Sequence, residues 1–318
     1  MSLEKRPLGR SGMSAAPLAL GGNVFGWTAD ESTSFAILDR FVDLGFNLVD
    51  TANVYSAWAP GHTGGESEAI IGKWFKRGGR RDAVLIATKV GLKMEGDEGL
   101  KAAQIEKHVE ASLRRLQTDR IDLYQTHKDD LGTPVEETLE ALGRLVKSGK
   151  VRAIGASQYG PERLRESLEA SKRLGLPRYE TLQPELNLYD RAGFQEKLLP
   201  VAQEYGLAVI PFFGLAKGFL SGKYRTLEET EGRPRAAGLK KYFEGDRGMR
   251  ILAALDAVGQ RIGATPAQVS IAWIMAQPTV AAPIVSATSV AQLDEIAKAA
   301  QVKLDGEALA ELDRASAG

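Results

Sequence analysis

Four polar residues with complementary chemistry stand at the ends of three successive apolar segments of this chain. They are Asp50 at the end of residues 46–50, Tyr55 shortly after it, Lys89 at the end of residues 84–89, and His127 after residues 121–126. A lysine that ends an apolar segment meets little water and needs a carboxylate partner, and Asp50 ends the neighbouring segment. Beside such a cation the pKa of Tyr55 should fall from its ordinary value of about 10, which suits a general acid. The pattern therefore predicts an acid–base site.

Each of these residues also has an ordinary structural interpretation. An aspartate at a strand end often caps a turn, Tyr55 could be a packing residue, and His127 could be a core histidine whose nitrogens are satisfied. Lys89 resists such an interpretation, because lysine is almost never buried without a partner. The occurrence of all four residues together favours a catalytic role.

Eight short apolar segments recur along the chain, and each precedes an amphipathic stretch. We expect strands at residues 17–20, 46–50, 84–89, 121–126, 151–156, 180–183, 207–212 and 282–285. The stretches between them carry apolar residues at helical spacing, such as Val135, Leu139 and Leu142. Alternation of strand and helix implies a parallel sheet. Eight such units predict a (β/α)8 TIM barrel, folded as a single domain over residues 1–318 with long loops at its C-terminal face.

A doubly wound sheet that binds a dinucleotide is the rival fold. It should show G-x-G-x-x-G after its first strand, but residues 21–26 read GGNVFG. Two segments are longer than a simple connection needs, SAWAPGHTGG at residues 56–65 and the stretch 213–248. Both follow expected strands, at the end of a barrel where enzymes of this architecture carry their chemistry.

Composition narrows the class of partner. The chain has 41 Lys and Arg against 41 Asp and Glu, three histidines and no cysteine. Neutral charge gives no reason to expect nucleic acid or an anionic membrane surface. The cysteine and histidine counts argue against disulfides, thiolate nucleophiles and a metal site. Because neither a leader-like N-terminus nor a membrane-length apolar run is evident, we expect a cytoplasmic protein that acts on a small molecule.

Seven segments of the chain resemble, in the same order, those of the aldo-keto reductase family, and the resemblance covers nearly the whole sequence. They are LVDTANVY at residues 48–55, GESE at 65–68, LIATK at 85–89, IDLYQTH at 121–127, IGASQ at 154–158, LQPELN at 182–187 and GFLSGK at 218–223. The resemblance implies reduction of an aldehyde or ketone by NADPH, with NADH as the alternative cofactor. Tyr55 would protonate the carbonyl oxygen and Lys89 would lower the pKa of this tyrosine. Asp50 would hold and neutralise Lys89, and His127 would orient the carbonyl group.

The same resemblance implies a cofactor site. Ser157, Gln158 and Gln183 would hold the nicotinamide carboxamide. Phe212 would stack on the nicotinamide ring, and the loop from Gly214 to Gly222 would contact the pyrophosphate. The other residues assigned to this site are Gly22, Asn23, Leu215, Lys217, Gly218, Lys223, Ser286, Thr288, Gln292 and Glu295. Of these, Lys223 could equally be a solvated loop charge.

One departure from the family pattern affects the choice of cofactor. Residues 283–288 read PIVSAT where P-G-A-R is commoner, so Thr288 stands where the family often has an arginine for the adenosine 2′-phosphate. We expect Ser286, Thr288 and Gln292 to donate hydrogen bonds to this phosphate. Because neutral donors bind phosphate less strongly than a bidentate arginine, the preference for NADPH over NADH should be smaller than in family members that have this arginine.

Other features leave alternatives open. The 56–65 loop is longer than the family's usual one, and Trp27, Trp58 and Phe213 could shape an apolar substrate site or merely pack its rim. Lys89 could instead form a Schiff base with a carbonyl substrate. The chain could also be a cofactor-binding regulatory subunit of a membrane channel, as some members of the family are. We expect His108 on the surface of its helix, and the sequence assigns neither a role to His62 nor an oligomeric state.

Overall fold

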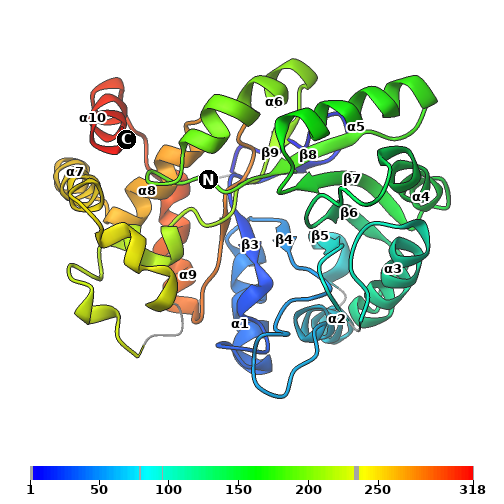
Figure 1. Cartoon of the computed structure of the whole chain (residues 1–318). Helices are drawn as coiled ribbons and strands as arrows, with labels where there is room; N and C mark the ends of the chain where they lie inside the picture. Colours follow the sequence, from blue (N-terminus) through cyan, green and yellow to red (C-terminus); the bar gives the residue numbers. More distant parts are fainter. Residues whose placement is uncertain (1–2, 79, 95, 233–235, 318) are drawn as a thin grey trace.

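The computed structural model describes residues 3–78, 80–94, 96–232 and 236–317, and an eight-stranded parallel sheet closed into a barrel forms its centre (Figure 1). In order around the barrel the strands are β10 (Ile284–Val285), β3 (Ala19–Gly21), β4 (Leu48–Asp50), β5 (Leu85–Val90), β6 (Ile121–Thr126), β7 (Val151–Ser157), β8 (Tyr179–Gln183) and β9 (Ala208–Val209). Between β9 and β10, Ala281 N donates to Val209 O and Ile284 N donates to Pro211 O, both at 2.8 Å. The (β/α)8 barrel predicted from the sequence is confirmed.

Each expected strand is present, with shifts of a few residues at the ends. The largest difference concerns the expected strand 207–212, of which only Ala208–Val209 belongs to the sheet. Pro211 carries no N–H group and cannot continue a ladder on both sides. Phe212 nevertheless stays beside β8, because its N–H donates to Pro184 O at 3.0 Å.

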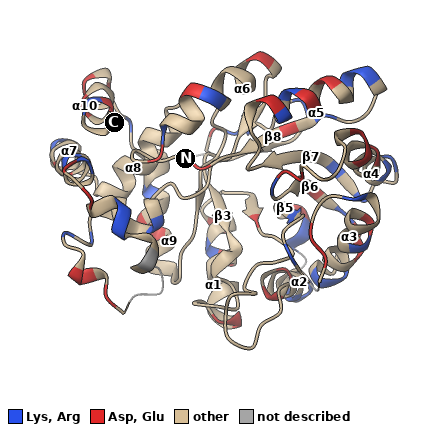
Figure 2. Cartoon of the chain, in the orientation of Figure 1, with Lys and Arg blue, Asp and Glu red and all other residues tan. Residues whose placement is uncertain are grey.

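Ten helices of the described residues surround the strands (Figure 1). They are α1 (Glu31–Asp43), α2 (Glu66–Gly78), α3 (Ala102–Leu116), α4 (Val135–Lys147), α5 (Pro161–Leu174), α6 (Leu199–Tyr205), α7 (Arg247–Ile262), α8 (Pro266–Met275), α9 (Val290–Ala297) and α10 (Gly306–Ser316). Figure 2 shows that charged residues gather on these helices and their loops, whereas the strands are mainly uncharged. Amphipathic helices bury one face against the sheet, which explains this separation.

An N-terminal hairpin, which the sequence analysis did not predict, covers one end of the barrel. It consists of β1 (Arg6–Pro7) and β2 (Ser14–Ala15), paired antiparallel. Strands of two residues are too short to show an alternating pattern. Leu8 and Met13 are buried in the inner core together with Ala19 and Leu48, the first residues of β3 and β4. The hairpin therefore closes the N-terminal end of the barrel.

The barrel interior changes from apolar to polar along the strands. The layer nearer the N-terminal ends of the strands is formed by small and apolar side chains, among them Ala87 and Leu123. Two residues further along β5 and β6 stand Lys89 and Gln125, both fully buried. Because alternate residues of a strand face the same side, the upper end of the interior carries polar groups.

The loop after β9 contains a succession of short helical turns before α7 begins. They are η4 (Ala216–Ser221), η5 (Glu228–Thr230), η6 (Ala236–Gly238) and η7 (Lys240–Phe243). None of the helices in the described ranges is both long enough and apolar enough to span a membrane.

Candidate active site

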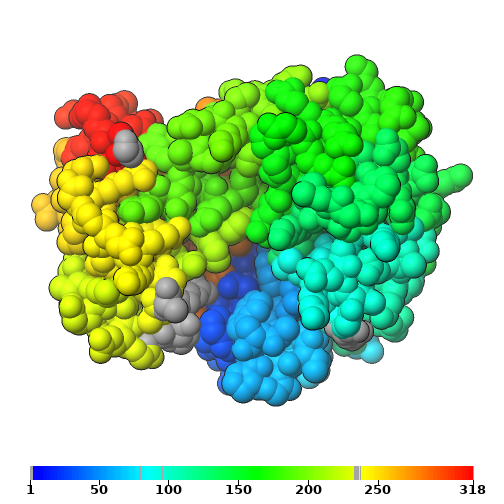
Figure 3. Space-filling view, in the orientation of Figure 1, coloured from blue at the N-terminus to red at the C-terminus, as the bar shows by residue number. Residues whose placement is uncertain are grey.

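A cavity of about 860 Å³ opens at the C-terminal ends of the barrel strands. In Figure 3 it corresponds to the hollow at the centre of the face, between the yellow segment after β9 and the blue N-terminal part of the chain. Asp50 and Tyr55 line one part of it, and Thr288, Gln292 and Glu295 line another, where α9 begins. A cavity of this size can bury a ligand larger than a simple carbonyl compound.

Lys89 is buried directly beneath Tyr55. Its Nζ atom donates to Asp50 Oδ2 at 2.6 Å, to the backbone oxygen of Thr51 at 2.8 Å and to Tyr55 Oη at 2.9 Å. An ammonium group has three hydrogens, so these acceptors satisfy it completely. The Lys89 side chain is 0% exposed and the Asp50 side chain 1% exposed, which makes this ion pair part of the barrel core. The partnership between Asp50 and Lys89 expected from the strand ends is present.

The pKa of Tyr55 departs from the sequence-based expectation. Burial, the negative charge of Asp50 and the 3.4 Å hydrogen bond from Tyr55 Oη to Asp50 Oδ2 raise this pKa well above its ordinary value of 10.0. The expected fall of this pKa is therefore not observed, because burial and the adjacent Asp50 carboxylate both favour the protonated phenol. Burial also lowers the pKa of Lys89, although Asp50 and Glu68 oppose that effect. Tyr55 consequently keeps its proton near neutral pH.

His127 lies beside Tyr55 at the cavity wall. Its backbone N–H donates to Val90 O at 2.8 Å, and its ring centroid lies 5.8 Å from that of Tyr55. Burial, followed by the positive charge of Lys89, lowers the pKa of His127 well below 6.5. The imidazole is therefore neutral at neutral pH and can offer one N–H donor to a ligand.

The three residues assigned to the carboxamide converge on the same wall of the cavity. Ser157, Gln158 and Gln183 all line it. Ser157 Oγ donates to the backbone oxygen of Gln183 at 2.9 Å, and Gln158 Nε2 donates to the backbone oxygen of His127 at 3.0 Å. Gln183 Nε2 donates to Asp50 Oδ1 at 2.9 Å. The candidate carboxamide site is thus hydrogen-bonded directly to the buried ion pair.

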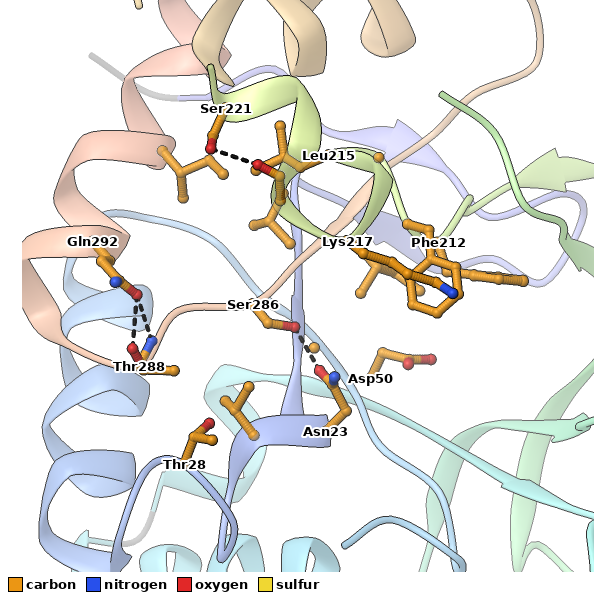
Figure 4. A pocket seen from close by; sticks show the side chains of 18 of the residues that line it. Asn23, Thr28, Asp50, Phe212, Leu215, Lys217, Ser221, Ser286, Thr288 and Gln292 are labelled. Atoms are coloured by element: carbon orange, nitrogen blue, oxygen red, sulfur yellow. Dashed lines mark hydrogen bonds between the residues drawn. The ribbon is translucent and has the colours of Figure 1, made fainter. Parts of the chain in front are cut away.

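The loop after β9 supplies aromatic rings and cations. Phe212 and Phe213 stand edge to face with ring centroids 5.0 Å apart. Lys217 Nζ lies 5.5 Å from the Phe213 ring centroid, and both Lys217 and Gly218 have positive φ angles, of 59° and 105°. Gly214, Leu215, Lys217, Gly218 and Lys223 all line the cavity. Figure 4 shows Lys217 and Phe212 on one side of the cavity, with Thr288 and Gln292 on the other.

The polar residues near α9 are hydrogen-bonded to one another. Ser286 Oγ donates to Asn23 Oδ1 at 2.6 Å, and both N and Oγ1 of Thr288 donate to Gln292 Oε1 at 2.9 Å (Figure 4). Each side-chain amide thus accepts through its oxygen, which leaves its nitrogen as the donor. The hydroxyl groups that the sequence analysis expected to meet a phosphate are engaged with these amides.

The rings of Trp27, Trp58 and Tyr55 form a continuous row of edge contacts at the cavity. The ring centroids of Trp27 and Trp58 are 5.7 Å apart, and those of Trp58 and Tyr55 are 5.9 Å apart. Trp58 is 48% exposed and Phe213 is 40% exposed, although both line the cavity. Their exposed surface therefore borders the space where a ligand would sit.

Gly22 and His108 lie in other surroundings than the sequence suggested, and only the expectation for His108 is wrong. Gly22 does not line the cavity, whereas its neighbour Gly21 does. The backbone oxygen of Gly22 accepts from Ser67 Oγ at 2.8 Å, so this residue supports the site from behind. His108 is 3% exposed rather than at the surface, because the face of α3 that carries it packs inward, and its Nδ1 lies 3.4 Å from Asn53 Nδ2.

Sequence reasoning missed several residues of the site. Gln125 contacts the ion pair from below, and Gly21, Thr28, Ser221, Tyr224 and Leu239 line the cavity. Gln125 could have been found, since it lies in the IDLYQTH segment at the inward spacing set by Leu123. Gly21 ends β3, and the others come from loops and short helical turns, where no periodic pattern shows which way a side chain faces. His62 is half-buried and stands outside the cavity lining. Within the described residues, no group of three or more metal-ligating side chains is found.

A comparison against protein families agrees with the barrel fold. The model of the aldo/keto reductase family matches residues 17–317, and the chain belongs to this family. Membership supports an oxidoreductase that acts on carbonyl groups with a nicotinamide cofactor.

Curated relatives cover nearly the whole chain. An uncharacterized oxidoreductase, YrpG, of Bacillus subtilis is 39% identical over 96% of this chain and 94% of its own length. A norsolorinic acid reductase of Emericella nidulans is 32% identical over 95% of this chain and 79% of its own. A probable voltage-gated potassium channel subunit beta of Arabidopsis thaliana is 30% identical over 94% and 92%. The family therefore includes relatives named as enzymes and relatives named as channel subunits.

Proposed function

We propose that this protein reduces aldehydes or ketones to alcohols with NADPH, with Tyr55 as the proton donor, in a single catalytic domain formed by residues 1–318. NADH is the alternative cofactor. The observation that carries the proposal is that Tyr55 lines the cavity while its hydroxyl oxygen lies 2.9 Å from Lys89 Nζ. An ammonium group at this distance can stabilise the tyrosinate that remains once the proton has left.

The residues around the cavity fit a nicotinamide dinucleotide. Gln183 uses its amide nitrogen on Asp50, so its oxygen can accept from a carboxamide NH2 group. Lys217 and Lys223 bring positive charge to the part of the cavity proposed for the pyrophosphate. A Cβ atom at Gly214 would lie 2.9 Å from Ile274 Cδ1, so a larger residue there would have to displace the end of this α8 side chain. When bound, the cofactor would supply the hydride to the carbonyl carbon.

The chain's own residues would manage the carbonyl oxygen. His127 can donate a hydrogen bond to this oxygen and orient it toward Tyr55. As negative charge develops on the oxygen, the Tyr55 hydroxyl transfers its proton and the alcohol forms. Lys89 stabilises the tyrosinate, and Asp50 keeps Lys89 charged in spite of its burial. The raised pKa of Tyr55 ensures that the proton is present before the reaction begins.

The proposed preference for NADPH rests on amide donors. The oxygen atoms of Asn23 and Gln292 are occupied by Ser286 and Thr288, so the amide nitrogens are the groups that would meet a 2′-phosphate. The N-terminal end of α9 lies in the same region and favours an anion. These are weaker partners than an arginine fork, so the preference for NADPH over NADH should be modest.

The aromatic side chains of Trp27, Trp58 and Phe213, which all line the cavity, favour an apolar carbonyl substrate. Planar rings contribute large contact areas and prefer other aromatic groups at edge-to-face or offset geometry. We therefore propose aryl or similarly apolar aldehydes and ketones as the substrates that bind this pocket.

The Schiff-base alternative finds no support in the position of Lys89. Its side chain is 0% exposed and its Nζ is held by three acceptors, so a carbonyl carbon in the cavity could not reach it without displacing Tyr55. The presence of all four residues of the proposed acid–base site favours an enzyme over a subunit that only binds cofactor.

The replacement Tyr55→Phe tests the proposed function. We expect turnover of an aromatic aldehyde with NADPH to fall about a hundredfold or more, because the proton donor is lost. The dissociation constant for NADPH should stay within about threefold, since the hydroxyl is needed only when the oxyanion develops. Tyr159→Phe provides a control, as this tyrosine is buried and bonded to Tyr179 outside the cavity lining. Turnover above about a tenth of the wild-type value in Tyr55→Phe would remove Tyr55 from the role of acid.

A further inference from the structure

Gln125 is a fully buried glutamine inside the barrel, directly below the proposed site. It belongs to β6, where it pairs with Lys89 of β5 on one side and with Gly155 of β7 on the other. A Cβ atom at Gly155 would lie 3.2 Å from Gln125 Cγ, so the glycine leaves room for this side chain. A buried amide costs free energy unless its groups are hydrogen-bonded. The partners of Gln125 therefore indicate what it does.

These partners are the proposed acid–base site and the proposed carboxamide site. Gln125 Nε2 donates to Asp50 Oδ1 at 3.3 Å, and Gln125 Oε1 accepts from Gln183 Nε2 at 3.2 Å. Gln183 Nε2 also donates to Asp50 Oδ1, at 2.9 Å. The two amides and the carboxylate thus form a closed triangle of hydrogen bonds in the barrel interior.

The triangle restrains both of its other members. The Oδ1 atom of Asp50 receives the two amides while its Oδ2 atom receives Lys89, so the carboxylate is held between them. The nitrogen of Gln183 is occupied by Asp50 and Gln125, which leaves the Gln183 oxygen as the atom available to a ligand. Gln183 and Asp50 line the cavity, and Gln125 does not.

We propose that Gln125 is a positioning residue that orients the Gln183 amide and holds Asp50 where it keeps Lys89 charged beneath Tyr55. It acts through Asp50 and Gln183, since it does not reach the cavity. The inference rests on the proposed function, because it concerns how that site keeps its geometry.

A carboxyl group in place of this amide would probe the electrostatics. The charged and titratable groups that face this part of the interior are Asp50 from β4, Lys89 from β5, and Tyr55 and His127 from the loops, with Glu68 of α2 acting on Lys89. A protonated glutamic acid at position 125 could still donate to Asp50 Oδ1. Once ionised, it would repel Asp50, and the proximity of Asp50 would raise its pKa toward the neutral range.

The test uses the full chain with Gln125→Leu, Gln125→Glu and the control Tyr124→Phe. Tyr124 adjoins Gln125 on β6, but it belongs to the larger hydrophobic core that the strands share with the helices and does not line the cavity. For each protein we would measure kcat and KM for an aromatic aldehyde from about pH 5 to pH 9, the dissociation constant of NADPH by tryptophan fluorescence, and thermal unfolding.

We expect Gln125→Leu to lower kcat about tenfold or more while the aldehyde KM stays within about twofold, because Asp50 loses a donor that no substrate contacts. NADPH binding should weaken about threefold as Gln183 loses its orientation. Gln125→Glu should work best at low pH and lose activity as pH rises, over a range in which the wild type does not. Tyr124→Phe should match the wild type in all measurements.

Other outcomes would overturn the inference. Wild-type kcat, pH profile and NADPH affinity in a folded Gln125→Leu protein would mean that Gln125 only fills space. If Gln125→Leu does not fold, a Gln125→Glu profile with the wild-type shape would lead to the same conclusion. A wild-type protein that neither binds NADPH nor reduces the aldehyde would overturn the proposed function, and this inference with it.

Discussion

At the scale of single residues, the proposed site combines a buried ion pair with two neutral groups that can exchange hydrogen bonds with a ligand. Asp50 and Lys89 carry the opposite charges, and burial keeps both Tyr55 and His127 uncharged near neutral pH. When negative charge develops on a bound carbonyl oxygen, Tyr55 would therefore still hold the proton that it donates. The ammonium group lies below this acid, where it can act on the anion that remains.

The lowered pKa of His127 predicts how the free energy of unfolding depends on pH. The pKa of His127 is lowered in the folded protein, so the unfolded chain binds a proton below about pH 6.5 that the folded protein does not. The free energy of unfolding should therefore decrease as pH falls through this range, and level off above it. We expect His127→Gln to flatten this dependence between about pH 4.5 and 6.5, measured by urea unfolding. Identical slopes for the two proteins would contradict the prediction.

The cofactor preference also depends on a single residue. We expect the wild type to bind NADPH about tenfold more tightly than NADH, a difference of about 1.4 kcal/mol. Thr288→Arg should increase this difference, because guanidinium binds phosphate with two charge-assisted hydrogen bonds. The gain should appear mainly as slower release of NADPH. Gln203→Arg adds the same charge on the exposed face of α6 and should change neither dissociation constant. Equal affinities for the two cofactors in the wild type would show that the 2′-phosphate binds elsewhere.

At the scale of elements, register in the parallel sheet brings distant residues to one level. Lys89 pairs with Gln125 across β5 and β6, and Ser157 pairs with Gln183 across β7 and β8. The loop after β4 is fixed at this end of the barrel, because Ser56 Oγ donates to the backbone oxygen of Phe25 at 2.7 Å. Trp58 follows Ser56 by two residues and lines the cavity.

The loop should select substrates through this tryptophan. In Trp58→Ala we expect kcat/KM for benzaldehyde to fall about tenfold more than kcat/KM for propanal, because only the aromatic substrate loses a ring contact as well as apolar contact area. Propanal serves as the internal control for damage to the acid–base site. Equal losses for both aldehydes would indicate that Trp58 packs the rim without contacting substrate.

At the scale of the whole molecule, one end of the barrel contributes to stability and the other end contains the proposed active site. The N-terminal hairpin closes one end with apolar contacts, and the C-terminal end carries the cavity. Separation of stability from chemistry along the barrel axis is characteristic of this architecture.

Leu8 tests this separation, because it is 0% exposed in the hairpin and belongs to the inner core. Leu8→Ala should lower the free energy of unfolding by about 2–5 kcal/mol, the usual cost of a cavity in a core. The kcat/KM of the folded variant should stay within about twofold of the wild type, since the cavity is at the other end. Leu131→Ala, at a position that is 84% exposed, should change neither quantity. A large loss of kcat/KM in Leu8→Ala would show that the two ends are coupled.

Patterns along the chain were enough to predict the barrel and the polar residues at its C-terminal end. The strands are short and regularly followed by amphipathic helices, and a parallel barrel gathers all its strand ends at one face. Asp50 and Lys89 could therefore be placed together before any distance was known. Local patterns suffice for such conclusions, because strand direction alone decides which end of the barrel a residue occupies.

How these groups affect one another could not be predicted from such patterns. The direction of the pKa shift of Tyr55 depends on its burial and on its distance from Asp50, which no spacing along the chain reveals. Gln125 meets Gln183 across 58 positions of sequence, and His108 is buried because its helix happens to turn that face inward. Electrostatic and hydrogen-bond energies vary steeply over a few ångströms. They are therefore determined by the packing of side chains brought together from separate elements.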